Sequence, residues 1–300
     1  MEEYHKPVLL LESVEALLGN PSGIYADATF GGGGHSREIL SRLSPRGRLM
    51  AFDRDEDSRA NIPDDARLEW IGNNFRFIRN YTLLKGYADG IDGILADLGV
   101  SSHQFDTAQR GFSFRFDAPL DMRMNREGKR TARDILATYG QEELARLMRL
   151  YGEVENAGRV AALIVKARQT REIVTTTDLN EAIREATPAL AAHKYLAKVY
   201  QALRIEVNDE MRSLEKFLEG AAASLKTGGR LVVITYHSLE DRMVKNFIRS
   251  GNVEGKMEKD LYGRTKAPLK AVGKDVVPQE EEIAGNTRAR SARMRVAEKI

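Results

Sequence analysis

A run of glycines between two apolar stretches is the part of the sequence best suited to bind a ligand. It reads Asp27-Ala-Thr-Phe-Gly-Gly-Gly-Gly-His-Ser36. Glycines at the turn from a strand to a helix let the backbone approach a ligand closely, at the edge where open α/β sheets bind their ligands. Ser36 stands where a dinucleotide fingerprint has its third glycine, and no lysine follows as in a phosphate-binding loop. NAD is therefore the less favoured ligand.

Acidic residues follow three of the apolar stretches. Asp27 precedes the glycines, Asp53 follows the stretch 49–52, and Asp97 follows the stretch 91–96. A carboxylate about 20 residues past the glycines can accept hydrogen bonds from both ribose hydroxyls of an adenosine. An acid followed by Gly31 and Gly33 is similar to the first motif of S-adenosylmethionine-dependent methyltransferases. The alternative is that these acids, like His35 and Ser36, only cap turns or helices.

Strand-like and helix-like patterns alternate through the first hundred residues, which predicts a mostly parallel sheet with helices on both faces. The expected strands are residues 24–28, 48–52, 68–71 and 91–96, and the expected helices begin near residues 9, 35 and 75. From about 131 to 225 the spacing is helical throughout, and a buried strand returns at 230–235.

The predicted fold is an α/β, Rossmann-like methyltransferase core with an inserted all-helical subdomain. The first core segment is expected over residues 1–104, and a helical insertion for substrate recognition over residues 105–212. The second core segment is expected over residues 213–300 and includes a charged loop at 251–285. Residues 288–296 alternate apolar and polar side chains and could form a final edge strand.

The composition excludes several classes of protein. The 300 residues include 46 basic and 44 acidic side chains, so the net charge of +2 indicates no particular partner. The absence of cysteine excludes disulfides, thiolate metal sites and a cysteine nucleophile, and the five histidines lack metal-ligand spacing, so we expect no metal. The N-terminus lacks a signal peptide, and no apolar run could span a bilayer. We expect a cytoplasmic protein with no membrane contact.

Nine segments in order give the chain a resemblance to the MraW family, methyltransferases of small-subunit ribosomal RNA. They are residues 5–10, 27–36, 53–55, 97–102, 110–114, 119–124, 201–205, 236–242 and 286–292. The resemblance implies transfer of a methyl group from S-adenosylmethionine to the exocyclic amine of one cytidine in 16S rRNA, within the small ribosomal subunit. It leaves a homodimer open.

The resemblance also assigns the cofactor positions: Gly33, Gly34, His35, Asp53, Phe75, Asp97 and Gln104. Phe75 has a physical reason of its own, since an aromatic ring after the third strand can stack on adenine; the alternative is a core aromatic. Many amino methyltransferases carry a Pro-Pro-aromatic sequence after the fourth strand, where this chain has Asp97-Leu-Gly-Val. The ring usually proposed to stack on the target base is therefore absent at this point.

The candidate catalytic residues are Asp97, Tyr236, His237 and Ser238, all expected at the carboxyl edge of the sheet. Asp97 could accept the proton of the target amine or hold the methionine amino group, and we favour the second role. A capping box in which Ser238 pairs with Asp241 is the competing interpretation of the later residues.

Two basic segments are candidates for RNA contact. The first spans residues 111–134, where the candidates are Arg115, Arg123 and Arg126, and the second spans residues 286–300, where they are Arg288 and Arg290. Ordinary solvated surface is the alternative for both. Alternative functions are methylation of another RNA, of DNA or of a small amine, and a non-catalytic role in ribosome assembly.

Overall fold

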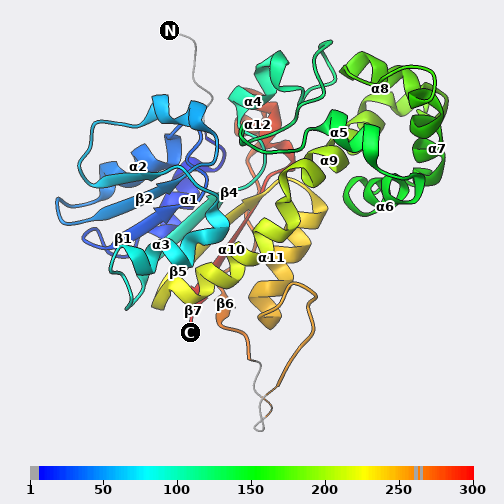
Figure 1. Ribbon diagram of the computed structural model, residues 1–300. Coiled ribbons are helices and arrows are strands. Elements are labelled where there is room, and N and C mark those ends of the chain that lie inside the picture. Colours follow the sequence, from blue (N-terminus) through cyan, green and yellow to red (C-terminus); the bar gives the residue numbers. More distant parts are fainter. Residues whose placement is uncertain (1–6, 260–262, 264–265) are drawn as a thin grey trace. The chain divides into compact units, whose positions relative to one another are not determined.

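The computed structural model describes residues 7–259, 263 and 266–300, so the first two residues of the matching segment 5–10 lie outside the described part. The chain divides into two compact units (Figure 1). The sheet unit comprises Met1–Gly99 and Met211–Ile300, and the helical unit comprises Val100–Glu210. The helical unit is therefore inserted within the sheet unit's sequence, with junctions at 99/100 and 210/211 compared with the predicted 104/105 and 212/213.

The sheet unit is built on seven strands in the order β3-β2-β1-β4-β5-β7-β6. Strands β1 to β5 are parallel, and β7 runs antiparallel to both β5 and β6. The bounds are β1 Ile24–Asp27, β2 Arg48–Phe52, β3 Leu68–Ile71, β4 Ile91–Asp97, β5 Leu225–Thr235, β6 Leu269–Ala271 and β7 Arg293–Lys299. The strand order reverses between β1 and β4, which is where doubly wound sheets bind ligands. The predicted Rossmann-like α/β fold is confirmed.

Helices cover both faces of this sheet because successive strand residues point to opposite sides. Ala26 and Met50 pack in one core with α3 (Ile78–Leu84), α10 (Glu210–Ser224) and α11 (Ser238–Ser250). Tyr25 and Leu49 pack in the other core with α1 (Leu10–Leu17) and α2 (Gly34–Arg42). The near-continuous apolar sequence of the central strands follows from burial on both faces.

The C-terminal part of the sheet differs from the prediction in two ways. The expected edge strand is β7, but it lies between β5 and β6 and is not an edge. The segment 251–285, expected as one loop, contains β6 and α12 (Glu280–Gly285). The cause of both errors is that β6 has three residues, of which only Leu269 is buried, so its sequence carries no strand period.

The helical unit has its own core. Its elements are α4 (Ser102–Asp106), α5 (Ala132–Thr138), α6 (Gln141–Gly152), α7 (Ala157–Arg168), α8 (Thr176–Ala182) and α9 (Ala192–Asn208). The apolar spacing correctly predicts its helices after residue 131, whereas α4 lies before that stretch and is not predicted. Capping boxes begin α5 and α8, where Thr131 pairs with Asp134 and Thr175 with Asp178. Among the described residues of the whole chain, no helix combines the length and apolar character that crossing a bilayer requires.

Candidate functional site

The glycine segment forms a tight turn from β1 into α2. Gly31 and Gly33 have φ angles of 51° and 75°, the left-handed region that other residues adopt only with strain. A Cβ on Gly34 would lie 2.1 Å from Cγ of Pro7, and one on Gly33 would lie 2.9 Å from Cζ of Phe30. The turn therefore needs glycine on conformational and steric grounds, and it presents backbone to whatever binds there.

The Asp53 carboxylate, directly after β2, accepts a hydrogen bond from this turn. One of its carboxylate oxygens accepts a hydrogen bond from the Gly31 amide and the other from the Asp55 amide, both at 2.8 Å. Burial raises the pKa of Asp53 to about 6, although both amides favour the charged form. Each oxygen keeps further acceptor capacity. Asp53 therefore stabilises a turn, as the alternative interpretation proposes, and its carboxylate can still accept hydrogen bonds from two neighbouring hydroxyls.

Two residues that sequence reasoning missed complete the turn. Arg37 donates to the Gly32 carbonyl at 2.7 Å and to the Asn61 carbonyl at 2.8 Å. The Asn61 side-chain amide donates to the Gly31 carbonyl at 3.0 Å. These bonds satisfy the carbonyls of Gly31 and Gly32 within the protein. No sequence signal marks them, because a backbone carbonyl can be satisfied by any donor of suitable reach.

Asp27 lies fully buried at the end of β1. Its carboxylate accepts from the Ser36 hydroxyl at 2.7 Å and from the Thr29 amide at 3.0 Å. Burial raises the pKa of Asp27 to about 6, and the Ser36 hydroxyl opposes that rise. Ser36 therefore anchors α2 to β1; the N-cap of that helix is Gly33, and neither Ser36 nor His35 caps it.

Asp97 ends β4 beside the turn, with its side chain 21% exposed. The Tyr236 hydroxyl donates to one carboxylate oxygen at 2.7 Å, and His35 Nδ1 lies 3.9 Å from the other. The Asp97 amide donates to the Thr29 hydroxyl at 2.7 Å, which ties β4 to β1. Burial raises the pKa of Asp97 to about 6, while His35 and the tyrosine hydroxyl favour the charged carboxylate. The carboxylate is therefore only partly covered by the protein.

His35 is oriented by the chain that precedes α1. Its Nε2 lies 3.2 Å from the Val8 carbonyl, which can only accept, so Nε2 carries a proton. Nδ1 then faces Asp97. Burial lowers the pKa of His35, and the nearby Asp97 carboxylate opposes that shift. The structure therefore brings together His35, Asp97 and Tyr236, three of the residues expected in the site.

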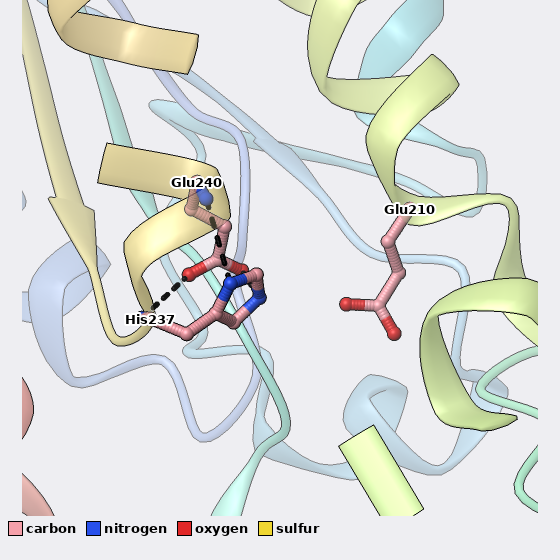
Figure 2. Close-up of side chains that lie close together, drawn as sticks. All are labelled: Glu210, His237 and Glu240. Atoms are coloured by element: carbon pink, nitrogen blue, oxygen red, sulfur yellow. Dashed lines mark hydrogen bonds and ion pairs between the residues drawn. The ribbon is translucent and has the colours of Figure 1, made fainter. Parts of the chain in front are cut away.

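The residues after β5 form the start of α11 (Figure 2). His237 is the N-cap: its Nδ1 accepts from the Glu240 amide at 3.4 Å, and the Glu240 carboxylate accepts from the His237 and Tyr236 amides at 3.4 and 2.9 Å. Ser238 is the first helical residue and is exposed. The competing interpretation, a box of Ser238 with Asp241, is wrong in its residues; the capping pair is His237 and Glu240. Glu210, also drawn in Figure 2, belongs to the helical unit, where it pairs with Arg204.

The remaining cofactor candidates lie in different units. Phe75 begins the short turn η2 (Phe75–Phe77) after β3, half-buried, with its ring 5.1 Å from the Phe217 ring. It is thus a core-edge aromatic with part of its surface open. Gln104 belongs to the helical unit, where it forms the capping box of α4 with Ser101. Its cofactor role stays a prediction.

Two arginines hold the first basic segment in place, Arg110 just before it and Arg123 within it. Buried Arg110 donates to the carbonyls of residues 123 and 124 at 3.0 and 3.1 Å. Arg123 pairs with both oxygens of Asp121 and donates to the carbonyls of residues 126 and 128. Arg115 and Arg126 are exposed. The structure thus gives Arg123 a role inside the segment and leaves Arg115 and Arg126 on the surface.

The second basic segment begins before β7 and includes that strand. Arg288 and Arg290 lie in η6 (Thr287–Ser291), and Asn286 caps this turn by accepting from the Arg288 amide at 3.1 Å. Because Arg293 pairs with Thr235 at the end of β5, the turn lies at the carboxyl edge, as Asp97 and Tyr236 do. Arg290 is exposed and Arg288 half-buried.

Comparison with known proteins shows the family of the chain. The model of the MraW methylase family matches residues 2–300. "Ribosomal RNA small subunit methyltransferase H" of Parabacteroides distasonis is 52% identical over 99% of this chain and 98% of its own length. The protein of the same name from Phocaeicola vulgatus is 54% identical over 99% and 97%. An rRNA methylase structure from Streptococcus thermophilus aligns with 96% of this chain and 92% of its own at a TM-score of 0.41 and 12% identity.

Proposed function

Because the chain belongs to the MraW methylase family, and is on that ground an rRNA methyltransferase, we propose that it moves a methyl group from S-adenosylmethionine to the exocyclic amine of one cytidine in 16S rRNA. The observation that carries the proposal is the carboxyl edge of the sheet. There a glycine turn, the Asp53 carboxylate and the half-open Asp97 carboxylate converge at the switch point between β1 and β4.

The donor set fits the chemistry of this cofactor. Asp53 has acceptor capacity for two ribose hydroxyls, and Asp97 has an open side for a methionine ammonium. Phe75 offers a partly open ring for adenine. Gly33 and Gly34 would lie against the ligand as backbone, with His35 behind them. When bound, the cofactor supplies an electrophilic methyl carbon on a positively charged sulfur.

The chain's part in the reaction is mainly positioning. The cytosine nitrogen forms a bond to the methyl carbon while the carbon–sulfur bond breaks and its electron pair returns to sulfur. The methylated nitrogen then loses a proton to an acceptor. Cytosine's amine is a weak nucleophile, so alignment with the carbon–sulfur bond is the largest contribution that the protein can make.

Tyr236 is assigned a positioning role toward Asp97. Its hydroxyl donates to that carboxylate, and burial followed by the Asp97 charge raises the pKa of Tyr236 well above its usual value. A tyrosine that stays protonated is a poor proton acceptor at neutral pH. His237 caps the N-terminus of α11, and Ser238, the first residue of that helix, is exposed.

The partner we propose is 16S rRNA, taken within the small ribosomal subunit. Arg290 at the carboxyl edge and Arg115 and Arg126 in the helical unit are exposed cations suited to phosphates. The target base must be unpaired or flipped out, because a duplex interior hides its amine.

Labelled methyl transfer tests the proposal. Purified protein and labelled S-adenosylmethionine would be incubated with small subunits, free 16S rRNA and DNA. We expect label in the ribosomal RNA and none in DNA. Label in DNA alone, or no transfer with cofactor bound, would refute the assignment of substrate.

A further inference from the structure

The peptide bond between Val8 and Leu9 is held at both ends by residues that lie far along the chain. The Leu9 amide donates to Oε1 of Glu282 at 2.7 Å, and the Val8 carbonyl lies 3.2 Å from Nε2 of His35. This peptide bond is trans, since the described part of the chain contains no cis peptide bond. The N–H and C=O of a trans peptide lie in one plane and point in opposite directions. Fixing the N–H therefore fixes the direction of the carbonyl.

This peptide lies in a buried part of the sheet unit. Val8, Leu9 and His35 are 6%, 1% and 5% exposed. A buried N–H without an acceptor is costly, so both the Leu9 amide and the imidazole need the partners that they have. The preceding residue, Pro7, packs against the glycine turn, where its Cγ would lie 2.1 Å from a Cβ on Gly34. The segment 7–9 therefore supports the turn as well as the histidine.

The acceptor of the Leu9 amide is not the one that helix capping would supply. Leu9 is the N-cap of α1, with φ 50° and ψ 39°, a left-handed conformation that leucine adopts only with strain. In a capping box the acid at the third helical position accepts from the N-cap amide. That position is Glu12, which is exposed, and the amide instead donates to Glu282 of α12. Strained backbone persists where the surrounding structure holds it, and such positions cluster at ligand sites.

The peptide determines which nitrogen of His35 faces the site. A carbonyl can only accept, so Nε2 carries the proton, and Nδ1 of the neutral ring keeps a lone pair. Nδ1 lies 3.9 Å from a carboxylate oxygen of Asp97. Two acceptors therefore face the same region. An ammonium group has three N–H donors and can bond to both.

We propose that Glu282 is a positioning residue of the cofactor site. By holding the Leu9 amide, it directs the Val8 carbonyl toward His35. The ring then presents the lone pair of Nδ1 beside the Asp97 carboxylate, where the ammonium group of S-adenosylmethionine can donate to both. A charged acceptor at one end of a peptide also polarises it and strengthens the hydrogen bond at the other end. This role rests on the proposed binding of S-adenosylmethionine at the carboxyl edge.

Calorimetry with S-adenosylmethionine compares two neighbouring glutamates of α12. E282A removes the acceptor of the Leu9 amide, and E281A makes the same change at an exposed position of the same helix. We expect E282A to bind about tenfold more weakly and E281A to bind as the wild type does. E282Q keeps a carbonyl oxygen for the amide and should restore most of the affinity. E282D keeps the charge but shortens the side chain, so it should behave as E282A does and serves if E282A does not fold.

A double-mutant cycle tests whether Glu282 acts through His35. Asparagine at position 35 keeps a polar atom near the place of Nδ1 but is too short to reach the Val8 carbonyl. E282A should therefore weaken binding in the wild-type background and change it by less than about twofold in the H35N background. A purely structural role for Glu282 would weaken binding equally in both backgrounds, which would overturn its role as a positioning residue.

Nuclear magnetic resonance of the histidine rings tests the positioning without the cofactor. The His35 Nε2–H should be protected from exchange with water in the wild type and in E281A, and H35N identifies its signal by removing it. In E282A the same proton should exchange about tenfold faster. An unchanged exchange rate, or an E282A variant that binds as tightly as E281A, overturns the role of Glu282. A wild-type protein that shows the protection, and loses it in E282A, but binds no S-adenosylmethionine leaves the positioning of His35 standing and refutes the proposed function.

Discussion

The Asp97→Asn substitution tests whether this carboxylate binds the cofactor as a charge. Asparagine keeps a carbonyl oxygen for the Tyr236 hydroxyl and can turn its amide toward His35 Nδ1, so the local packing is retained. Only the charge is lost. A hydrogen bond to a charged group contributes about 1.5–3 kcal/mol, so we expect S-adenosylmethionine to bind about 10- to 150-fold more weakly.

The pH dependence makes the same test without a mutation. The pKa of Asp97 is about 6 in the unliganded protein, and a bound cation favours the carboxylate. Affinity should therefore be constant above pH 7 and fall as the pH drops below 6. At pH 5 about one tenth of the Asp97 side chains are ionised, which weakens binding about tenfold. Asp53, with a pKa of about 6, adds a second such dependence.

Isothermal calorimetry from pH 5 to 8, in buffers of different ionisation enthalpy, gives both the affinity and the protons released. Wild-type protein should release up to two protons on binding near pH 5, and Asp97→Asn one fewer. The reasoning is refuted if Asp97→Asn binds as tightly as wild type, or if the wild-type affinity is the same at pH 5 and pH 7.5.

Three further substitutions test the framework. Because the folded-state pKa of Asp27 is raised from 3.8 to about 6, its contribution to stability is full below pH 4 and is lost as the pH rises through 6. Asp27→Asn should therefore raise the free energy of unfolding by about 2–3 kcal/mol at pH 8 and by much less at pH 4. Urea titrations that show no gain in stability at pH 8 would contradict this prediction. Gly33→Ala, at φ 75° with Phe30 2.9 Å from the new Cβ, should cost about 1–2 kcal/mol and weaken cofactor binding, measured by melting with and without cofactor; an unchanged Tm would show that the turn tolerates a side chain. Arg123→Gln should destabilise the helical unit by about 1–3 kcal/mol, which would be seen as faster proteolysis of that unit. The salt dependence of RNA binding should be unchanged. A weaker salt dependence with normal stability would instead indicate that Arg123 contacts RNA.

The longer strands and helices could be predicted from the sequence because each is long enough to show its hydrophobic pattern. The central strands are apolar on both faces, and the helices of the insertion carry repeated apolar spacing. Short elements failed: β6 has one buried residue, and α12 has three acids in its first turn and no buried residue. The order of β6 and β7 depends on pairing between segments far apart in the sequence, which local patterns do not encode.

Some residues of the candidate site could be predicted from the sequence and others could not. Glycines and acids at strand ends are visible in the sequence, because the chemistry needs those residue types at those places. Their partners are less visible: Tyr236 meets Asp97 across 139 residues, and Asn61 meets Gly31 across 30. The N-cap of α11 could not be predicted from residue preference: His237 occupies it, although serine, present at the next position as Ser238, is the more common N-cap residue.

Mass spectrometry tests most directly the proposed methyl transfer to a cytosine amine of 16S rRNA. Small subunits that lack the modification would be treated with S-adenosylmethionine and either wild-type protein or Asp97→Asn. Their RNA would then be extracted and digested to nucleosides and oligonucleotides. We expect one cytidine of 16S rRNA to gain a single methyl group on its exocyclic nitrogen, with much less product from the variant at limiting cofactor. A methyl group on carbon, on ribose or on another base, or no methylation by the wild-type protein, would contradict the account.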